Sequence, residues 1–249
     1  MFRTPLNLFV LCAVILASAP SIATDMFADH PGFSDASSTL NKAEKQLEFG
    51  IEGAVSHGSE INLAGAALIR WGIGKSLEAR LELPALVFAD GSPLVDTLEL
   101  GVKKKVHAGK KLSLAVLPAF VAPAGGDRSS VGLGVSVGLI ADYVLSDALA
   151  LTVSAVPRGV RSQGNIGQTE SSLTFDVAVA VGLGYAVSKK LGVYVEGWSV
   201  LAEHGSVYAG DLVLTLLVDK NTLLDAYVGV QNSGSATAPY FGVGYCVRL

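Results

Sequence analysis

The sequence is poor in cysteine and in long apolar runs, and each scarcity excludes a class of protein. Only 2 cysteines occur in 249 residues, and Cys12 lies in an apolar run near the N-terminus. If that run is removed as a leader, Cys246 stands alone and no internal disulfide is possible. No later stretch offers about 18 uninterrupted apolar residues, so we expect no membrane-spanning helix.

Charge and potential metal ligands are sparse as well. Charged residues make up 16% of the chain, and the formal net charge is −4. A mildly acidic protein is a poor partner for the phosphates of nucleic acid. The 4 histidines and Cys246 lack the spacing of metal ligands. We therefore expect no cofactor, no metal and no nucleic-acid partner.

The N-terminal stretch "MFRTPLNLFVLCAVILASAPSIATD" predicts a secretory signal peptide. Arg3 gives a positive start, an apolar run of about a dozen residues follows, and small residues allow cleavage after Ala23. We expect three parts: the signal peptide (1–23), a polar segment (24–45) and a single barrel domain (46–249). Two alternatives remain open for residues 24–45, namely a flexible tail and a plug that folds into the barrel lumen.

The stretch "RWGIGKSLEARLELP" (70–84) shows the pattern that recurs along the chain. In it, Glu78, Arg80 and Glu82 alternate with small or apolar residues. Strict alternation predicts a strand with two unlike faces. In a soluble protein the charged face would meet water. In a membrane barrel it would line the lumen, and the apolar face would meet lipid.

The bulk composition favours the membrane barrel. Hydrophobic residues make up 50% of the chain, and the mean hydropathy is +0.48. Together with an export signal and no spanning helix, these values indicate an all-β, antiparallel, up-and-down outer-membrane barrel of about twelve strands. The expected strands are 46–56, 60–73, 76–86, 95–107, 111–122, 131–144, 148–157, 171–187, 190–200, 210–219, 222–231 and 239–249.

The expected connections alternate between tight and loose. The tight ones are 74–76, 107–110, 145–147, 188–190 and 219–221. Most of the others are longer, and 84–93 is an example; Arg158 and Arg161 are expected in another. Outer-membrane barrels have short periplasmic turns and longer outer loops. An even number of strands returns both chain ends to one side.

The alternation assigns polar residues to the lumen. A functional interpretation is a pathway that favours cations and orients polar solutes. A structural one is that Arg70 and Arg80 pair with neighbouring carboxylates and fill a narrow interior. Small inward residues such as Gly182 and Gly184 favour a lumen with room for a ligand. The lumen candidates are Glu48, Glu52, Asn62, Arg70, Glu78, Arg80, Glu82, Glu99, Lys103, Lys105, Asp142, Asp176, Glu196, Asp211, Asp225, Gln231 and Arg248.

Four aromatic residues on the apolar face form a second pattern. Trp71, Tyr143, Tyr185 and Tyr245 each precede a tight turn or the C-terminus by a few residues. If the strands run as expected, all four lie at one height on the outside of the barrel. We interpret them as half of an aromatic girdle at the periplasmic interface.

Two stretches, "LELGVKKKV" (98–106) and "LPAFVAPAGG" (117–126), carry a family resemblance. With the repeated plan of a strand, a tight turn and an alternating strand, they make residues 46–249 resemble the outer-membrane family of transporters labelled for the phenol-degradation meta pathway. The resemblance implies passage of small, often aromatic, compounds. It provides no binding residue to carry over. The chain ends in "YCVRL", whereas such barrels usually end in an aromatic residue.

These observations predict a passive outer-membrane channel for small solutes and no enzyme. Its expected partners are outer-membrane lipid, lipopolysaccharide, the barrel-insertion machinery and the solute. A structural or surface-interaction barrel is one alternative. A lipid hydrolase is another, because "HGS" occurs at 57–59 and 204–206, and a His near a Ser can act as base and nucleophile. No third residue is seen to orient His57 toward Ser59 or His204 toward Ser206.

Overall fold

The computed structural model describes residues 26–29, 33–55, 61–89, 92–95, 97–124, 131–162, 172–203, 205–234 and 236–249. The expected signal peptide, residues 1–23, lies outside the described residues. So do His57, Ser59 and His204 of the two "HGS" stretches, while Ser206 directly precedes a strand.

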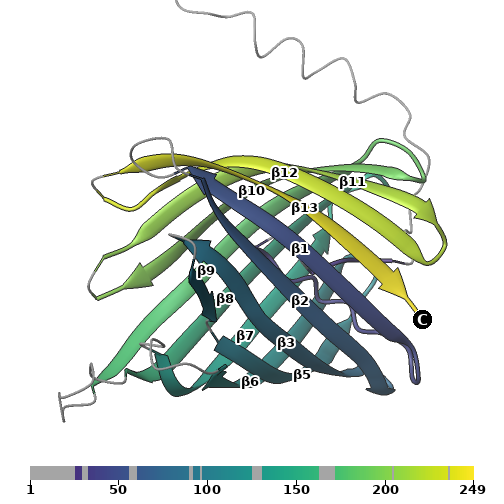
Figure 1. The fold of residues 1–249 in the computed structure, drawn as a ribbon. Helices are drawn as coiled ribbons and strands as arrows, with labels where there is room; N and C mark the ends of the chain where they lie inside the picture. Colours follow the sequence, from purple (N-terminus) through teal and green to yellow (C-terminus); the bar gives the residue numbers. More distant parts are fainter. Residues whose placement is uncertain are drawn as a thin grey trace, which may run out of the picture.

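The described chain folds into antiparallel strands. They are β1 (Lys45–Val55), β2 (Ile61–Gly74), β3 (Leu77–Ala89), β4 (Ser92–Val95), β5 (Thr97–Ala108), β6 (Leu112–Pro123), β7 (Val131–Val144), β8 (Leu149–Ser162), β9 (Leu173–Ala186), β10 (Leu191–Ala202), β11 (Val207–Asp219), β12 (Thr222–Asn232) and β13 (Thr237–Arg248). Pairing of β1 with β13, and of β2 with β1 and β3, closes the sheet into a barrel (Figure 1). No helix in these residues is long and apolar enough to span a membrane.

Strand β4 changes the local picture but not the architecture. It pairs only with the end of β3, where Leu86 lies opposite Val95. The same register continues between β3 and β5, where Glu82 lies opposite Glu99. The stretch 84–93, which was expected to be a loop, is therefore largely a hairpin. The wall of the barrel has twelve strands within the described chain, and the predicted fold is confirmed.

The exposed face of the wall is apolar and the buried face is charged, which is the reverse of a soluble protein. Large apolar side chains such as Val135, Leu139 and Phe175 are exposed, whereas Glu48 and Arg70 are buried. Soluble proteins bury apolar side chains and leave charged ones in water. The reverse arrangement fits a wall with lipid outside and polar groups inside. Lys104 stands on the apolar face, and its Nζ donates to the carbonyl oxygen of Lys75 in a turn, 3.1 Å away.

The connections divide into two rims. The short-turn rim, as we name it, carries the connections 75–76, 109–111, 145–148, 187–190 and 220–221. It also carries both ends of the barrel, since Gln46 of β1 lies opposite Arg248 of β13. The opposite rim is named the long-loop rim. Strands reach further toward it than expected, because β11 already begins at Val207.

Strand β8 shows why one predicted boundary is wrong. It continues to Ser162 instead of ending at Pro157. Proline has no N–H to donate, and the pairing of β8 with β7 passes over Pro157. On the other side Pro157 still lies opposite Val177 of β9. Arg158 and Arg161 are therefore strand residues and not loop residues, and Arg158 Nη2 donates to Asp176 Oδ2 at 2.9 Å.

Candidate functional site

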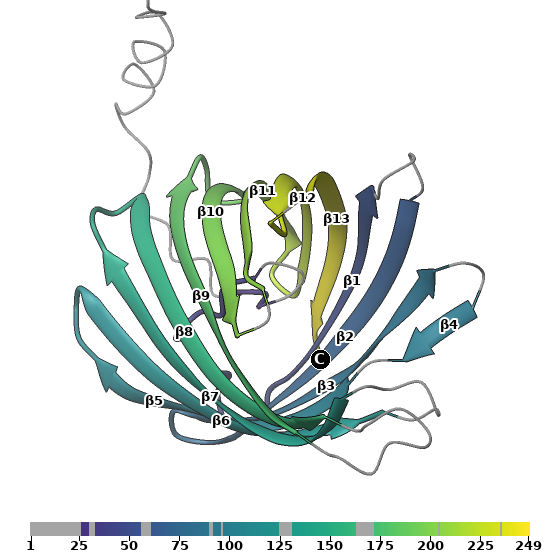
Figure 2. The ribbon, with the colours of Figure 1, turned by 90° about the vertical axis from the view of Figure 1, so that its left-hand side faces the viewer.

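The lumen contains the chain segment that precedes β1. We name residues 26–29 and 33–44 the lumenal segment, and Figure 2 shows it in purple inside the ring of strands. The segment meets β2 backbone to backbone. The N–H of Ala43 donates to Gly72 O at 2.7 Å, and the N–H of Gly72 donates to Glu44 O at 2.9 Å. A Cβ on Gly72 would lie 1.8 Å from Asn41 O, so this close approach requires glycine.

A turn connects the lumenal segment to β1. The backbone N–H and the Nδ2 of Asn41 donate to the Glu44 carboxylate at 2.9 and 3.0 Å. The side-chain hydrogen bond from Asn41 is the main reason why the pKa of Glu44 is lowered. Ala43 has φ +71°, a left-handed conformation that costs a residue with a Cβ about 1 kcal/mol. Local bonds therefore define this turn in spite of some backbone strain.

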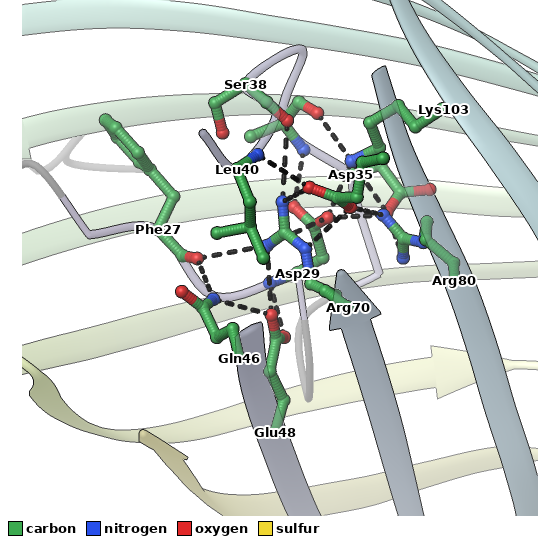
Figure 3. A network of polar contacts seen from close by, with 12 residues as sticks. Phe27, Asp29, Asp35, Ser38, Leu40, Gln46, Glu48, Arg70, Arg80 and Lys103 are labelled. Carbon is green, nitrogen blue, oxygen red and sulfur yellow. Dashed lines mark hydrogen bonds and ion pairs between the residues drawn. The ribbon is translucent and has the colours of Figure 1, made fainter. Parts of the chain in front are cut away.

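Asp29 is the centre of a buried ion network (Figure 3). Its Oδ2 accepts from Arg80 Nη1 at 2.5 Å and from Lys103 Nζ at 2.6 Å, and it lies 3.3 Å from Arg70 Nη1. Burial alone would raise the pKa of the Asp29 carboxyl. The charges of the three cations outweigh burial and hold this pKa well below its ordinary value. One carboxylate of the lumenal segment thus bridges β2, β3 and β5.

Carboxylates of the barrel wall complete the network around Arg70. Arg70 Nε donates to Glu78 Oε1 at 2.8 Å, and Arg70 Nη1 donates to Glu48 Oε1 at 2.9 Å. The Arg70 side chain is only 1% exposed. A charge buried this deeply is tolerated only when it is paired and hydrogen-bonded. Asp35 of the lumenal segment adds a contact at the edge, where its Oδ1 lies 2.9 Å from Arg80 Nη2.

Wall carboxylates also accept hydrogen bonds from the backbone of the lumenal segment. The N–H of Asp29 donates to Glu48 at 2.7 Å. The N–H of Ser37 donates to Asp142 at 2.7 Å, and the N–H of Leu40 donates to Glu78 at 2.8 Å. The N–H groups of Phe33 and Ser34 both donate to Glu196, at 2.9 and 3.0 Å. The segment has no regular secondary structure, so these bonds satisfy backbone donors that would otherwise be buried without partners.

Aromatic side chains line the lumen along β10, β12 and β13. The rings of Phe33 and Trp198 stack with 4.2 Å between centroids and 4° between planes. Trp198 Nε1 donates to Tyr240 Oη at 2.9 Å, and Tyr240 Oη donates to Asp211 Oδ2 at 2.6 Å. Tyr227 packs edge-on against Tyr240. We name Trp198, Tyr227 and Tyr240 the aromatic platform.

The space beside several inward-facing glycines is filled by aromatic rings of neighbouring strands. A Cβ on Gly184 would lie 2.5 Å from the ring of Tyr194, and one on Gly229 would lie 2.5 Å from the ring of Tyr240. Gly182, opposite Glu196, is adjacent to the hydroxyl of Ser34. The room expected at Gly182 and Gly184 is therefore filled by Ser34 and Tyr194. Within the described residues, no group of three or more His, Cys, Asp or Glu side chains could hold a metal ion.

The family comparison agrees with this barrel. The family model described as "Putative MetA-pathway of phenol degradation" matches residues 28–249. The chain belongs to this family. The matched range includes most of the lumenal segment as well as every strand. No curated protein matches the chain.

Solved structures of porins and of an outer membrane channel share the fold. The NanC porin aligns with TM-score 0.61 and 9% identity over 82% of this chain and 100% of its own. The COG4313 outer membrane channel from Pseudomonas putida F1 aligns with TM-score 0.59 and 9% identity over 85% and 97%. The KdgM porin in complex with disordered oligogalacturonate aligns with TM-score 0.58 and 12% identity, over 81% of this chain and 98% of its own. Identities this low show a shared fold only.

The structure distributes the lumen candidates over three environments. Those in contact with the lumenal segment are Glu48, Arg70, Glu78, Arg80, Lys103, Asp142 and Glu196. Those bonded to the aromatic platform are Glu52, whose Oε2 accepts from Tyr227 Oη at 2.5 Å, and Asp211, whose Oδ2 accepts from Tyr240 Oη. Asp225 is buried on β12, two residues before Tyr227. The remaining ones lie elsewhere on the wall. Glu99 is bonded to Ser136, Asp176 is bonded to Arg158, and Glu82 lines a 40 Å³ cavity with Asp35 and Arg80. Four more are half-buried on β2, β5, β12 and β13, namely Asn62, Lys105, Gln231 and Arg248.

The four girdle candidates lie close to the short-turn rim. Trp71 and Tyr143 are exposed near the ends of β2 and β7, and Tyr245 is exposed near the end of β13. Tyr185 is half-buried near the end of β9. Lys45 Nζ lies 5.8 Å from the centre of the Trp71 ring. Their role as an interface girdle remains a proposal.

Sequence reasoning missed two groups of residues. The aromatic platform could have been found, because Trp198 follows Glu196 by two positions and so shares its face of β10. The lumenal residues Asp29, Phe33 and Ser34 carried no comparable signal. Their stretch is irregular, and nothing in its pattern indicates which strands it would contact.

Proposed function

We propose that this protein is an outer-membrane channel for the passive passage of small solutes. The observation that carries the proposal is a closed barrel with an apolar exterior and a charged lumen. Its fold, which is that of outer-membrane porins, supports the proposal. The name of the family supports aromatic or other hydrophobic solutes as the substrate class.

In this proposal the chain is exported by a signal peptide spanning residues 1–23 and lies in the outer membrane of a bacterium with two membranes. Lipid and lipopolysaccharide contact the apolar face. The insertion machinery reads the alternating side chains of β13, which include Val243, Tyr245 and Val247. The short-turn rim faces the periplasm, and the aromatic girdle at that interface consists of Trp71, Tyr143, Tyr185 and Tyr245.

We further propose that the lumenal segment closes the channel at rest. It makes ion pairs or hydrogen bonds with side chains of β1, β2, β3, β5, β7 and β10. Beside the segment, the cavity between Asp35, Arg80 and Glu99 has a volume of about 40 Å³, which holds about one water molecule. Passage of a solute would then require the segment to move or a route around it.

The test is a planar-bilayer conductance measurement on refolded residues 24–249 beside the same barrel starting at residue 46. A heat-dependent gel shift checks that both chains are folded. We expect conductance steps from the shortened chain and few from the longer one. Steps of equal size and frequency from both chains would contradict closure by the segment. Silence from both would contradict the diffusion channel, and uptake of phenol into liposomes would then separate a route for hydrophobic solutes from a structural barrel.

A further inference from the structure

The contact between Phe33 and the aromatic platform resembles a bound ligand more than a structural core. The Phe33 ring is 38% exposed and contributes one face of a parallel stack. The Trp198 ring that it covers is fixed at its edge, where Nε1 donates to Tyr240 Oη of the barrel wall at 2.9 Å. A loosely covered ring on a firmly held one is an arrangement in which the upper ring can be replaced.

The two tyrosines of the platform are held by groups of the barrel wall, independently of the lumenal segment. The ring of Tyr240 lies over Gly229, where a Cβ would be 2.5 Å away, and the ring of Tyr227 lies over Gly242, where it would be 2.3 Å away. The hydroxyls of these tyrosines are bonded to Asp211 and Glu52. All these partners belong to the barrel wall. Binding sites hold their shape when packing and further hydrogen bonds fix the side chains in this way.

The polar end of the contact defines which groups a ligand needs. Glu196, two residues before Trp198, accepts the N–H groups of Phe33 and Ser34 and also the hydroxyl of Ser34. Phe33 and Ser34 therefore present one aromatic ring and adjacent hydrogen-bond donors. The site offers a ring face and carboxylate acceptors in return.

The charge of the site excludes one class of aromatic compound. The carboxylates of Glu196, Asp211 and Glu52 surround the platform, and in the described residues no ion pair reaches any of them. An aromatic carboxylate would place a second negative charge near Glu196, and like charges at close range repel. A neutral donor such as a phenol, or a cationic one such as an amine, would be accepted.

We propose that Trp198, Tyr240, Glu196 and Asp211 form a binding site for an aromatic solute that carries a neutral or cationic hydrogen-bond donor. Phe33 and Ser34 occupy this site at rest as an internal competitor. The proposal deepens the proposed channel function by naming its substrate class. A solute and Phe33 cannot occupy the platform together. Binding of a solute therefore releases this part of the lumenal segment, and the apparent affinity for the solute is reduced by the free energy of that release.

The sequence offers a direct probe of binding. The chain has 2 tryptophans, Trp71 and Trp198, so the Trp71→Phe variant leaves Trp198 as the single fluorophore. Folded residues 24–249 in detergent are titrated with phenol, benzylamine, benzoate and cyclohexanol, with excitation above the absorption of these compounds. We expect saturable changes with phenol and benzylamine, at least tenfold weaker binding of benzoate, and none of cyclohexanol. Equal binding of benzoate and benzylamine would overturn the charge assignment.

Removal of the competitor separates this site from a general apolar one. In the Phe33→Ala variant we expect the apparent affinity for phenol to rise about tenfold or more, because a competent site that was mostly occupied becomes available. Phe27→Ala is the matched control, since Phe27 belongs to the same segment and is 40% exposed but makes none of the ring stacks found in the described residues. An unchanged affinity in folded Phe33→Ala protein would overturn the proposal.

The role of Glu196 is tested in the Phe33→Ala background, where the competitor no longer complicates the result. Glu196→Gln keeps a hydrogen-bond acceptor and removes the charge. We expect the affinity for benzylamine to fall about tenfold and that for phenol to stay within a factor of three. Equal changes for both ligands would contradict the assignment of Glu196 to the donor group.

A reversible lock provides a second readout. A Cβ on Gly182 would lie 3.6 Å from Ser34 Oγ, a separation close to that needed for a disulfide between Ser34→Cys and Gly182→Cys. We expect the oxidised double variant to lose the phenol response and a reductant to restore it, while Ser34→Cys alone responds in both states. Undiminished phenol binding by the oxidised protein would overturn the competition.

These binding experiments are independent of passage. If phenol binds but does not enter liposomes through the protein, the channel proposal fails and the site stands. If phenol enters liposomes at equal rates through the parent and the Trp198→Ala variant and does not bind, the site fails and the channel proposal stands.

Discussion

Two contacts of the lumenal segment, one at Asp29 and one at Phe33, are held by opposite kinds of chemistry. At Asp29 a carboxylate with a fully buried side chain is shared by three cations from three strands (Figure 3). At Phe33 a partly exposed ring lies on Trp198, and backbone donors meet one carboxylate. The contact at Asp29 depends on the pairing of one carboxylate with three cations, which a small solute could not reproduce. The second can be reproduced by any small molecule with a ring and a donor. The lumenal segment is therefore anchored on one side of the lumen, at β2, β3 and β5, and can be displaced by a solute on another side, at β10.

The largest expected effect comes from removing the shared carboxylate. Asp29→Ala leaves Arg70, Arg80 and Lys103 with one negative partner fewer, and breaking a buried ion pair from one side costs about 3–5 kcal/mol. We expect the lumenal segment to detach and its amide hydrogen exchange, measured by mass spectrometry on residues 33–44, to become more than a hundredfold faster.

Asp35→Ala is the matched control, because Asp35 contacts the same Arg80 but its side chain is 20% exposed. We expect a much smaller acceleration from it. Equal effects of the two substitutions would mean that Asp29 is not the main anchor.

A smaller effect is expected where the segment meets β2. In Gly72→Ala the new Cβ would lie 1.8 Å from Asn41 O, and the backbone must shift. Overpacking of this kind costs about 1–3 kcal/mol. We expect faster exchange of the Ala43 amide and an unchanged heat-dependent gel shift. Gly65→Ala on the same strand is the control, since its Cβ would find the nearest atom 3.7 Å away. A response in Gly65→Ala as large as in Gly72→Ala would refute the explanation by close approach.

Relief of strain should give an effect of about 1 kcal/mol. Ala43 has φ +71° and Ser76 has φ +56°. Ala43→Gly should slow exchange in the lumenal segment without changing the barrel. Ser76→Gly, in the turn between β2 and β3, should raise the temperature of the gel shift without changing the segment. A segment response to Ser76→Gly would show that the barrel turn and the segment are coupled.

The smallest expected effect concerns pH. The pKa of Asp29 is held well below the ordinary 3.8. A carboxyl with a depressed pKa in the docked state stabilises docking fully above its ordinary pKa, and this contribution declines as the pH falls toward the depressed value. Between pH 7 and about pH 5, intrinsically corrected exchange of residues 26–29 should stay constant. Faster exchange within that window would mean that the charge of Asp29 is not what holds this part of the segment.

Much of the wall could be predicted from alternation alone. The parity that places Glu48 and Arg70 on one face follows from the period of a strand, and the structure has both side chains buried and in contact. The same parity contained Trp198, which was overlooked because only polar and small residues were sought on the inner face. Pro157 misled the boundary of β8, since a proline ends pairing on one side of a strand and not necessarily on both.

The contacts of the lumenal segment could not be predicted. Asp29 is 74 residues from Lys103, and nothing between them signals that they will meet. Their approach depends on closure of the ring, which brings β5 and the start of β1 to the same interior. Irregular backbone also has no period that would indicate a face. Such a segment is recognised only when the positions of its acceptors are known.

The distance along the chain between Phe33 and Glu196 has a consequence for the order of assembly. Their hydrogen bond joins residues separated by 163 positions. Phe33 can form this hydrogen bond only after β10, which lies far along the chain, has joined the sheet. The contact of Phe33 is therefore completed late in assembly, whereas the contacts of Asp29 need only β1, β2, β3 and β5. One stretch of chain thus joins its two partners at different stages of assembly.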